Sequence, residues 1–275
     1  MPSLEIQKQV VDYLDTVETE SKKSKAVKLP ETLNEQRYIV ECVEALATRI
    51  AKAQFLRGET SQEIDLLFFK ISKKIFEEVS SKLTTIGEAF RVSTGGTPSR
   101  SNPSYWNGDV KWVSSGEVAF SQIEDTKEKI TKLGVSESNA KVYPPNTVLI
   151  AMIGQGKTRG QCAILDCYAA TNQNVAGIHV YETEHLTKYV YWWLRSRYLE
   201  SRLSEIGTAQ PALSGERVKQ MPIPLPPLDE QRRIVAYLDS VQARLASLRE
   251  LQSKTQEELD ALLPSVLDRA FKGEL

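Results

Sequence analysis

Two long segments of the chain place apolar residues at alternating spacings of four and three. In the second segment eight of ten such positions are apolar: Ile234, Leu238, Val241, Leu245, Leu248, Gln252, Thr255, Leu259, Leu262 and Val266. The first segment has the same count, eight of ten: Ile39, Val43, Leu46, Ile50, Ala53, Arg57, Thr60, Ile64, Leu67 and Ile71. This spacing predicts two long helices, each with a narrow apolar seam that needs a partner.

The two segments are copies of one another. Residues 33–76 align without a gap with residues 228–271 at an offset of 195, and 14 of the 44 positions are identical. A shorter copy opens the chain, because seven of 14 positions in 4–17 match 228–241, and a stretch rich in Lys and Ser follows at 20–28. We therefore expect a partial repeat and linker at 1–28, a first spacer helix at 29–80 and a second at 226–275.

Both seams become polar at equivalent places, with Arg57 and Thr60 in the first copy and Gln252 and Thr255 in the second. Gly58 lies beside the first break, so a kink or a recess is plausible there. The helices are interpreted as an antiparallel coiled-coil pair carrying an inserted domain. The alternative is that each belongs to an ordinary helical-bundle core.

Between the helices, residues 81–225 have a different sequence pattern, with short apolar runs separated by Gly, Ser, Asn and Pro. The runs 148–153 and 176–181 predict buried strands, and 189–203 predicts an amphipathic helix. The expected fold class is α+β, with one mixed α/β domain flanked by two long antiparallel coiled-coil helices.

Several loops of this central domain combine glycine with side chains that contact DNA. Lys and Arg neutralise phosphates. Arg, Gln and Asn can each form two hydrogen bonds to the edge of one base. Each loop alone is also compatible with a plain solvated surface, and it is their joint presence that favours DNA. The candidate DNA-binding residues are Arg100, Gln155, Lys157, Arg159, Asn172, Gln173 and Gln210.

Charge, cysteines and local motifs exclude several other functions. The net charge of -1 does not indicate nucleic acid by itself, and the apolar runs are too short to cross a bilayer. Three cysteines without framework spacing fit a reducing compartment, so we expect a cytoplasmic protein with no membrane association. His179 and His185 complete no metal signature, and no catalytic residue is predicted.

Two motifs resemble enzyme sites but are incomplete. Residues 154–158 (GQGKT) lack the first glycine of a phosphate-binding P-loop, because that position is Ala151. Residues 102–105 (NPSY) resemble the tetrapeptide of adenine methyltransferases, but Ser104 stands where those enzymes have proline. We therefore expect neither nucleotide binding nor methyl transfer by this chain alone.

The combination of motifs resembles the specificity subunits of type I restriction–modification systems. Residues 225–235 (LPPLDEQRRIV) resemble the start of that family's spacer helix, and 90–117 (FRVSTGGTPSRSNPSYWNGDVKWVSSGE) resemble the opening of its target recognition domain. Residues 154–160, 169–173 and 210–214 resemble further motifs in the same order. The resemblance covers nearly the whole chain from about Leu29.

The resemblance implies a non-catalytic subunit that positions two methyltransferase subunits on double-stranded DNA. Those partners carry the adenine methylation site and use S-adenosylmethionine, so no cofactor is expected in this chain. A motor and nuclease subunit completes the assembly when DNA is cleaved.

The chain departs from the family pattern, because that family has two recognition domains and this chain has one. It resembles a half-subunit, and we hypothesise that two chains form a homodimer around their helices. Contacts with the methyltransferase or the second chain are assigned to Arg37, Arg49, Arg232 and Arg244. A monomer whose two helices pair with each other is the alternative.

Two other functions remain open. The chain could be the recognition part of a one-piece restriction–methylation enzyme, or a coiled-coil scaffold with a protein-binding insert. Salt-sensitive DNA binding separates the scaffold from the other two.

Overall fold

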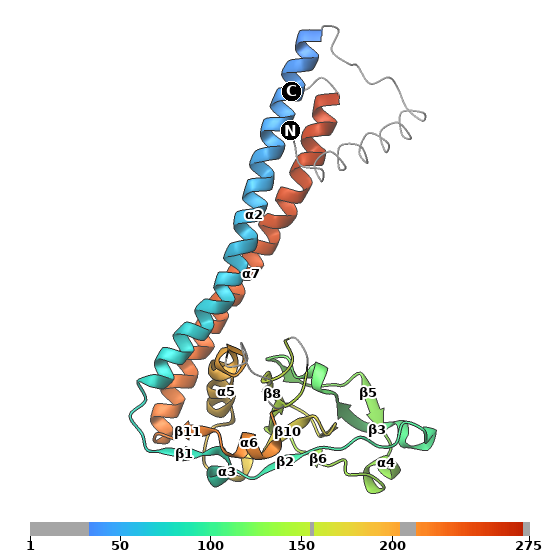
Figure 1. The fold of residues 1–275 in the computed structure, drawn as a ribbon, viewed down its shortest axis with the longest axis vertical. Helices are drawn as coiled ribbons and strands as arrows, with labels where there is room; N and C mark the ends of the chain where they lie inside the picture. Colours follow the sequence, from blue (N-terminus) through green and yellow to red (C-terminus); the bar gives the residue numbers. More distant parts are fainter. Residues whose placement is uncertain (1–32, 155–156, 204–212, 272–275) are drawn as a thin grey trace. The chain divides into compact units, whose positions relative to one another are not determined.

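The structure, a computed structural model, describes residues 33–154, 157–203 and 213–271. The chain divides into two compact units, and each is described by itself. The first contains residues up to 65 and from 243 onward, and the second contains residues 66–242. Helices α2 (Leu33–Glu77) and α7 (Leu228–Phe271) contribute to both units (Figure 1).

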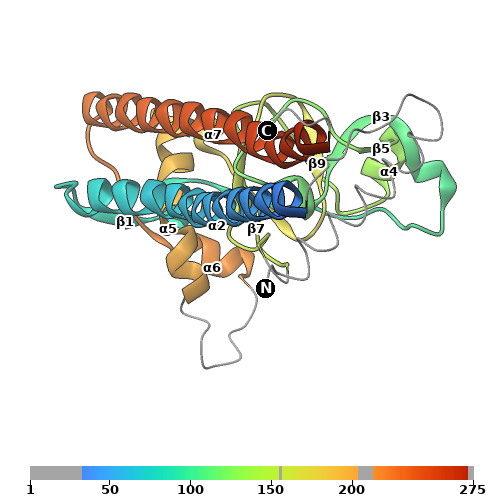
Figure 2. The ribbon, with the colours of Figure 1, turned by 90° about the horizontal axis from the view of Figure 1, so that it is seen from above.

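In the first unit α2 and α7 pack side by side in opposite directions, as Figures 1 and 2 both show. Ala47 and Ile50 of α2 form a buried cluster with Leu263 and Leu267 of α7. Beside it, Gln54 Nε2 donates a hydrogen bond of 2.7 Å to Asp260 Oδ1. Because residue numbers rise along one helix as they fall along the other, the pair is antiparallel, as expected.

The predicted seam is wrong at Leu248, which is 47% exposed, and near the end of each repeat. It placed Leu67 and Leu262 inside, but these equivalent leucines are 46% and 44% exposed, whereas the next residues, Phe68 and Leu263, are 1% and 9% exposed. The reason is geometric, since a straight helix drifts about 20° per heptad from a 3.5-residue repeat. Over four heptads the drift approaches the angle of one residue, so the buried face moves forward by one position in both copies.

The described part of the second unit holds three small sheets. Their strand orders are β2-β10-β7-β8-β4, β5-β3-β9-β6 and β1-β11. The strands are β1 Leu83–Thr85, β2 Val92–Thr94, β3 Trp106–Val113, β4 Gln122–Ile123, β5 Glu128–Ile130, β6 Val142–Tyr143, β7 Val148–Ala151, β8 Cys162–Leu165, β9 Ala169–Thr171, β10 Val175–Ile178 and β11 Pro222–Pro224. The helices of this unit are α3 Ile86–Ala89, α4 Lys132–Ser136, α5 Thr187–Leu203 and α6 Gly215–Lys219, with short 3-10 turns between them.

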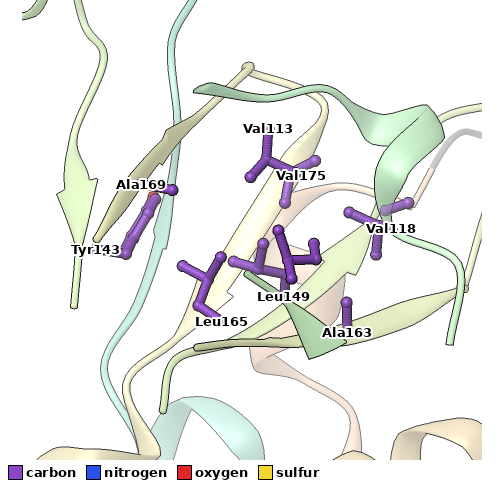
Figure 3. Packing of buried hydrophobic residues seen from close by; sticks show 10 residues of the cluster. Val113, Val118, Tyr143, Leu149, Ala163, Leu165, Ala169 and Val175 are labelled. Carbon is purple, nitrogen blue, oxygen red and sulfur yellow. The ribbon is translucent and has the colours of Figure 1, made fainter. Parts of the chain in front are cut away.

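The core of this unit is an apolar cluster that joins residues from several strands, including Val113, Leu149, Leu165 and Val175 (Figure 3). Every residue of β7, β8 and β10 is buried, which explains why these strands are continuous apolar runs rather than alternating ones. The predicted strands at 148–153 and 176–181 are therefore present, although β7 ends at Ala151 and β10 at Ile178.

Helix α5, which matches the predicted helix at 189–203, packs against β7 and β8 and also contacts the parts of α2 and α7 inside the second unit. The rings of Phe68 and Trp192 lie 5.3 Å apart, and Trp192 Nε1 donates to Asp239 Oδ1 at 3.0 Å. Lys188 Nζ lies 2.9 Å from the same carboxylate. These contacts fix the ends of the long helices in the second unit. This unit contains the segment 81–225, which resembles a target recognition domain, and it is named the recognition unit from here on.

Gln231 explains part of the repeated motif at the start of α7. Its side chain is fully buried, donates from Nε2 to Pro226 O at 2.8 Å, and accepts at Oε1 from Leu186 N at 3.1 Å. Because a buried amide needs hydrogen-bond partners, these bonds fix the start of α7 relative to Pro226 and Leu186. The expected α+β class is confirmed, and none of the helices in the described ranges is long and apolar enough to span a membrane.

Candidate nucleic-acid interface

Three loops of the recognition unit meet because the strands that carry them end together. Thr171 at the end of β9 pairs with Val113 at the end of β3. Only three residues separate Thr171 from Val175, the first residue of β10, which pairs with Ala151 at the end of β7. β2 ends one position along, with Thr94 opposite Ala176. The loops at 95–100, 152–161 and 172–174 therefore share one edge, here named the loop edge.

Backbone hydrogen bonds hold the loop edge together. Gly96 N donates to Thr171 O at 2.9 Å, and Met152 N donates to Asn174 O at 2.8 Å. A side chain on Gly95 would place its Cβ 2.1 Å from Thr171 Oγ1, and one on Gly96 would lie 2.4 Å from the Asn139 carbonyl carbon. The paired glycines are thus required by close backbone approach.

The loop at 152–161 carries two candidate cations. Lys157 is exposed, and its carbonyl accepts a 2.6 Å hydrogen bond from Tyr198 Oη, which attaches the loop to α5. Arg159 is half-buried in the same loop. Gln155 lies outside the described residues, as does Gln210.

The two candidates at 172–173 have different environments. Gln173 is exposed, and its Oε1 accepts a hydrogen bond from Thr97 Oγ1 across the loop edge. Asn172 is only 8% exposed, and its Oδ1 accepts from Asn174 N at 3.0 Å. Asn172 therefore stabilises the turn that presents Gln173, and its amide is largely removed from solvent.

Arg100 is held beside β5, on the flank of the loop edge. Its two Nη atoms donate to the two carboxylate oxygens of Glu128, one of them at 2.9 Å, and its guanidinium lies 3.7 Å from the centre of the Trp106 ring. The hydrogen bonds with Glu128 raise the pKa of Arg100, and those with Arg100 lower the pKa of Glu128. This arrangement positions Arg100 firmly but uses two of its donors inside the protein.

A Ser–His contact nearby is structural. His179 Nδ1 lies 2.8 Å from Arg91 Nη2, which can only donate, so Nδ1 accepts. The neutral ring then carries its proton on Nε2, which donates to Ser93 Oγ at 2.8 Å and cannot take the hydroxyl proton. Burial and Arg91 lower the pKa of His179, in agreement with a neutral ring. The pair anchors β2 to β10.

The described residues contain no group of three or more His, Cys, Asp or Glu side chains arranged to hold a metal ion. Cys42, Cys162 and Cys167 are free thiols, and burial raises the pKa of the fully buried Cys162. A buried thiol with a raised pKa is a poor nucleophile, so Cys162 acts as a core residue.

A family model described as the type I restriction modification DNA specificity domain matches residues 78–257 of the chain. That match covers more than half of the 275 residues. The chain belongs to this family of type I specificity proteins. The loop edge and the first part of α7, from Leu228 to residue 257, lie within the matched residues, whereas α2 ends at Glu77, just before them.

Curated relatives of this specificity family include the specificity subunit of the Escherichia coli type I restriction enzyme EcoR124I/EcoR124II. It is 26% identical over 179 residues, which are 64% of this chain and 44% of the relative. The MjaIX specificity subunit of Methanocaldococcus jannaschii is 27% identical over 186 residues, covering 65% and 41% respectively. The chain therefore spans less than half of the length of these two relatives.

Solved structures extend the similarity to the fold. One, from work on complex assembly and conformational transition of the type I R-M system, has a TM-score of 0.73 and 27% identity, covering 90% of this chain and 61% of that one. The HsdS subunit from Thermoanaerobacter tengcongensis has a TM-score of 0.55 and 28% identity, covering 88% and 59%. Both similarities extend over most of this chain, which covers about 60% of each solved chain.

The four arginines predicted to contact partner proteins are exposed on the helices: Arg37, Arg49 and Arg244 in the first unit and Arg232 in the second. Arg232 forms an ion pair of 2.8 Å with Asp229 on its own helix. Their exposure is compatible with a partner, and their role stays a prediction.

The sequence interpretation missed Thr97, which contacts Gln173, and the two lysines Lys127 and Lys129 on the flank. The lysines had a usable signal, because alternation in Lys127-Glu128-Lys129 places both lysines on one face of a strand. The signal for Thr97 depends on strand pairing far apart in sequence, which the pattern does not contain.

Proposed function

We propose that this chain is the DNA specificity subunit of a type I restriction–modification complex, in which it recognises one half of a split target. The observation that carries this proposal is the loop edge, where the loops that contain Lys157, Arg159 and Gln173 follow neighbouring strand ends. Cations there contact phosphates, and Gln173 contacts a base edge. Gln155 and Gln210 remain candidates from the sequence alone.

The chemistry belongs to partner chains in this proposal. A methyltransferase subunit docks on the helices and supplies the adenine-modifying site with S-adenosylmethionine, and a motor and nuclease subunit joins for cleavage. This chain contributes sequence recognition and performs no reaction. A cytoplasmic location stays a prediction.

A homodimer is proposed because both repeats expose the same apolar residue. Leu56 and Leu251 are equivalent in the repeat and identical, yet they are 50% and 60% exposed in the first unit. Leu248 lies one helical turn away from Leu251 and is also exposed. Exposed leucines repeated on both helices are typical of a surface that another protein covers, and a second chain with the same helices would cover it symmetrically.

The test combines the purified chain with the methyltransferase encoded beside it. We expect co-elution on size exclusion, and methyl transfer from labelled S-adenosylmethionine to DNA only when both chains are present. Co-elution without DNA-dependent methylation would favour the scaffold function. If the neighbouring gene encodes a fused methylation and restriction enzyme, the one-piece alternative is favoured.

A further inference from the structure

A basic pocket lies beside the loop edge, between strands β3 and β5. It has a volume of about 510 Å³, and it is named here the β3–β5 pocket. The residues that line it are Arg100, Trp106, Asn107, Gly108, Thr126, Lys127, Glu128 and Lys129. Of these residues only Arg100 is a DNA-binding candidate from the sequence.

A β-bulge forms one wall of the pocket. Trp106 and Val110 of β3 both pair with Ile130 of β5, so residues 107–109 have no partners in the ladder. Asn107 adopts a φ of 61°, and a Cβ on Gly108 would lie 2.6 Å from the Thr131 Cα. Bulges redirect side chains near binding sites, and this one interrupts the ladder at Ile130, the residue after Lys129.

The pocket has excess positive charge. Its lining contains three cations (Arg100, Lys127 and Lys129) and one carboxylate (Glu128), a net charge of +2. Glu128 is already paired with Arg100, while Lys129 shares Asp125 with Lys111 at 3.8 and 3.6 Å. Among the described residues, Lys127 Nζ has no carboxylate within 4.0 Å. An anionic ligand would supply the missing partner.

The position of the pocket relates it to DNA bound at the loop edge. Trp112 of β3 pairs with Glu128, so Lys127 lies level with Val113, where β3 reaches the loop edge. Lys127 N also donates to Glu117 Oε1 at 2.9 Å, which fixes it to the turn after β3. β5 lies two strand spacings, about 10 Å, from β9. A duplex carries one phosphate per roughly 1.7 Å of its axis, so DNA on the loop edge presents phosphates at this distance.

We infer that the β3–β5 pocket binds phosphodiester groups of the duplex held at the loop edge. Lys127 and Lys129 provide the charged contacts. Arg100 is a positioning residue, because its pairing with Glu128 keeps that carboxylate from repelling the phosphates. This inference rests on the proposed DNA recognition and extends the contact area beyond the loops.

The test measures DNA affinity of the full chain with its methyltransferase as a function of salt, using one duplex that contains the target and one that does not. Lys127→Ala and Lys129→Ala should each lower the slope of log affinity against log salt by about 0.9, because each removes one phosphate contact. The double variant should lose roughly tenfold affinity for both duplexes alike at low salt. Lys127→Arg should retain the wild-type slope.

Lys82→Ala is the matched control, because Lys82 is exposed and lies outside the pocket. The inference is overturned if the double variant has the same slope and affinity as Lys82→Ala while the wild type still prefers its target. A wild-type complex without salt-sensitive DNA binding would overturn the proposed function instead. Thermal unfolding of each variant shows whether a loss of affinity comes from loss of folding.

Discussion

The helix pair and the loop edge expose opposite kinds of surface. On the helices of the first unit, Leu56, Leu248 and Leu251 are exposed and apolar. At the loop edge, Lys157 and Gln173 are exposed and polar, and the loops beneath them are held by backbone hydrogen bonds and close glycine contacts. In the proposed function the helices bind protein partners, whereas the loop edge binds DNA.

The difference also concerns how each surface is held. A helix forms from local hydrogen bonds, so its surface residues tolerate substitution without loss of the helix. The loop edge depends on strand pairing between residues far apart in sequence, so one wrong side chain disturbs several loops at once. The predictions below use this contrast, in order of decreasing effect.

The largest effect is expected from Gly95→Val. The added Cβ would lie 2.1 Å from Thr171 Oγ1 and 2.2 Å from the Thr171 carbonyl oxygen. Because the carbonyl oxygen is part of the backbone, the loop edge must deform to accommodate the side chain. We expect destabilisation of the recognition unit by about 3 kcal/mol or more and loss of detectable target binding. Calorimetry and DNA binding measure the two effects. Gly116→Ala is the control, because nothing lies within 4 Å of its new Cβ.

A second large effect is expected from the pair of changes Leu56→Arg and Leu251→Arg. Four like charges would meet if these leucines face a second chain, so the dimer should dissociate at micromolar concentration while the recognition unit stays folded. Light scattering gives the mass, and circular dichroism gives the helix content. Leu83→Arg is the control, because Leu83 is 62% exposed but lies in β1 and not on the helices, and it should leave the mass unchanged. A wild-type chain that is monomeric at all concentrations contradicts the dimer.

Gln173→Ala and Lys157→Ala should separate recognition of sequence from attraction to phosphate. We expect Gln173→Ala to cost about 1–3 kcal/mol on the target duplex only, because a base-edge contact carries sequence information. Lys157→Ala should weaken binding to all duplexes equally and lower the slope of log affinity against log salt by roughly 1. Titrations of target and non-target duplexes distinguish the two. Identical behaviour of the two variants would mean that Gln173 does not contact a base.

The smallest effect is a pH dependence of stability from His179. Burial and Arg91 lower its folded pKa below the unfolded value of about 6.5, so the unfolded chain binds a proton before the folded chain does. Its contribution is present above the unfolded pKa and is lost as pH falls toward the folded pKa. The melting temperature should fall between pH 7.5 and 5.5 in the wild type, and fall less in His179→Gln.

Much of the helix pair could be predicted because its order is local and repeated. The boundaries of α2 and α7 lie within the predicted spacer segments, and the wrong seam positions, Leu67 and Leu262, follow from the small difference between 3.5 and 3.6 residues per turn. Gln231 was visible as a repeated residue, but its buried hydrogen bonds depend on contacts with residues about 45 positions away.

The loop edge was predictable in composition but not in geometry. The sequence indicated Lys157 and Gln173 as DNA contacts without showing that their loops meet. It did not distinguish exposed Gln173 from buried Asn172, since the difference arises from one turn between two sheets. Arg100 was selected for its charge, and its pairing with Glu128 depends on the register of β3 and β5.

The most direct test of the central claim is a map of methylated adenine in genomic DNA from cells with and without this chain, in the presence of the methyltransferase. The account predicts a split motif that is methylated only when the chain is present, palindromic if two chains form the complex, and weakened by Gln173→Ala. An unchanged methylation pattern, with the methyltransferase bound to the chain, would contradict the assignment of DNA recognition to the loop edge.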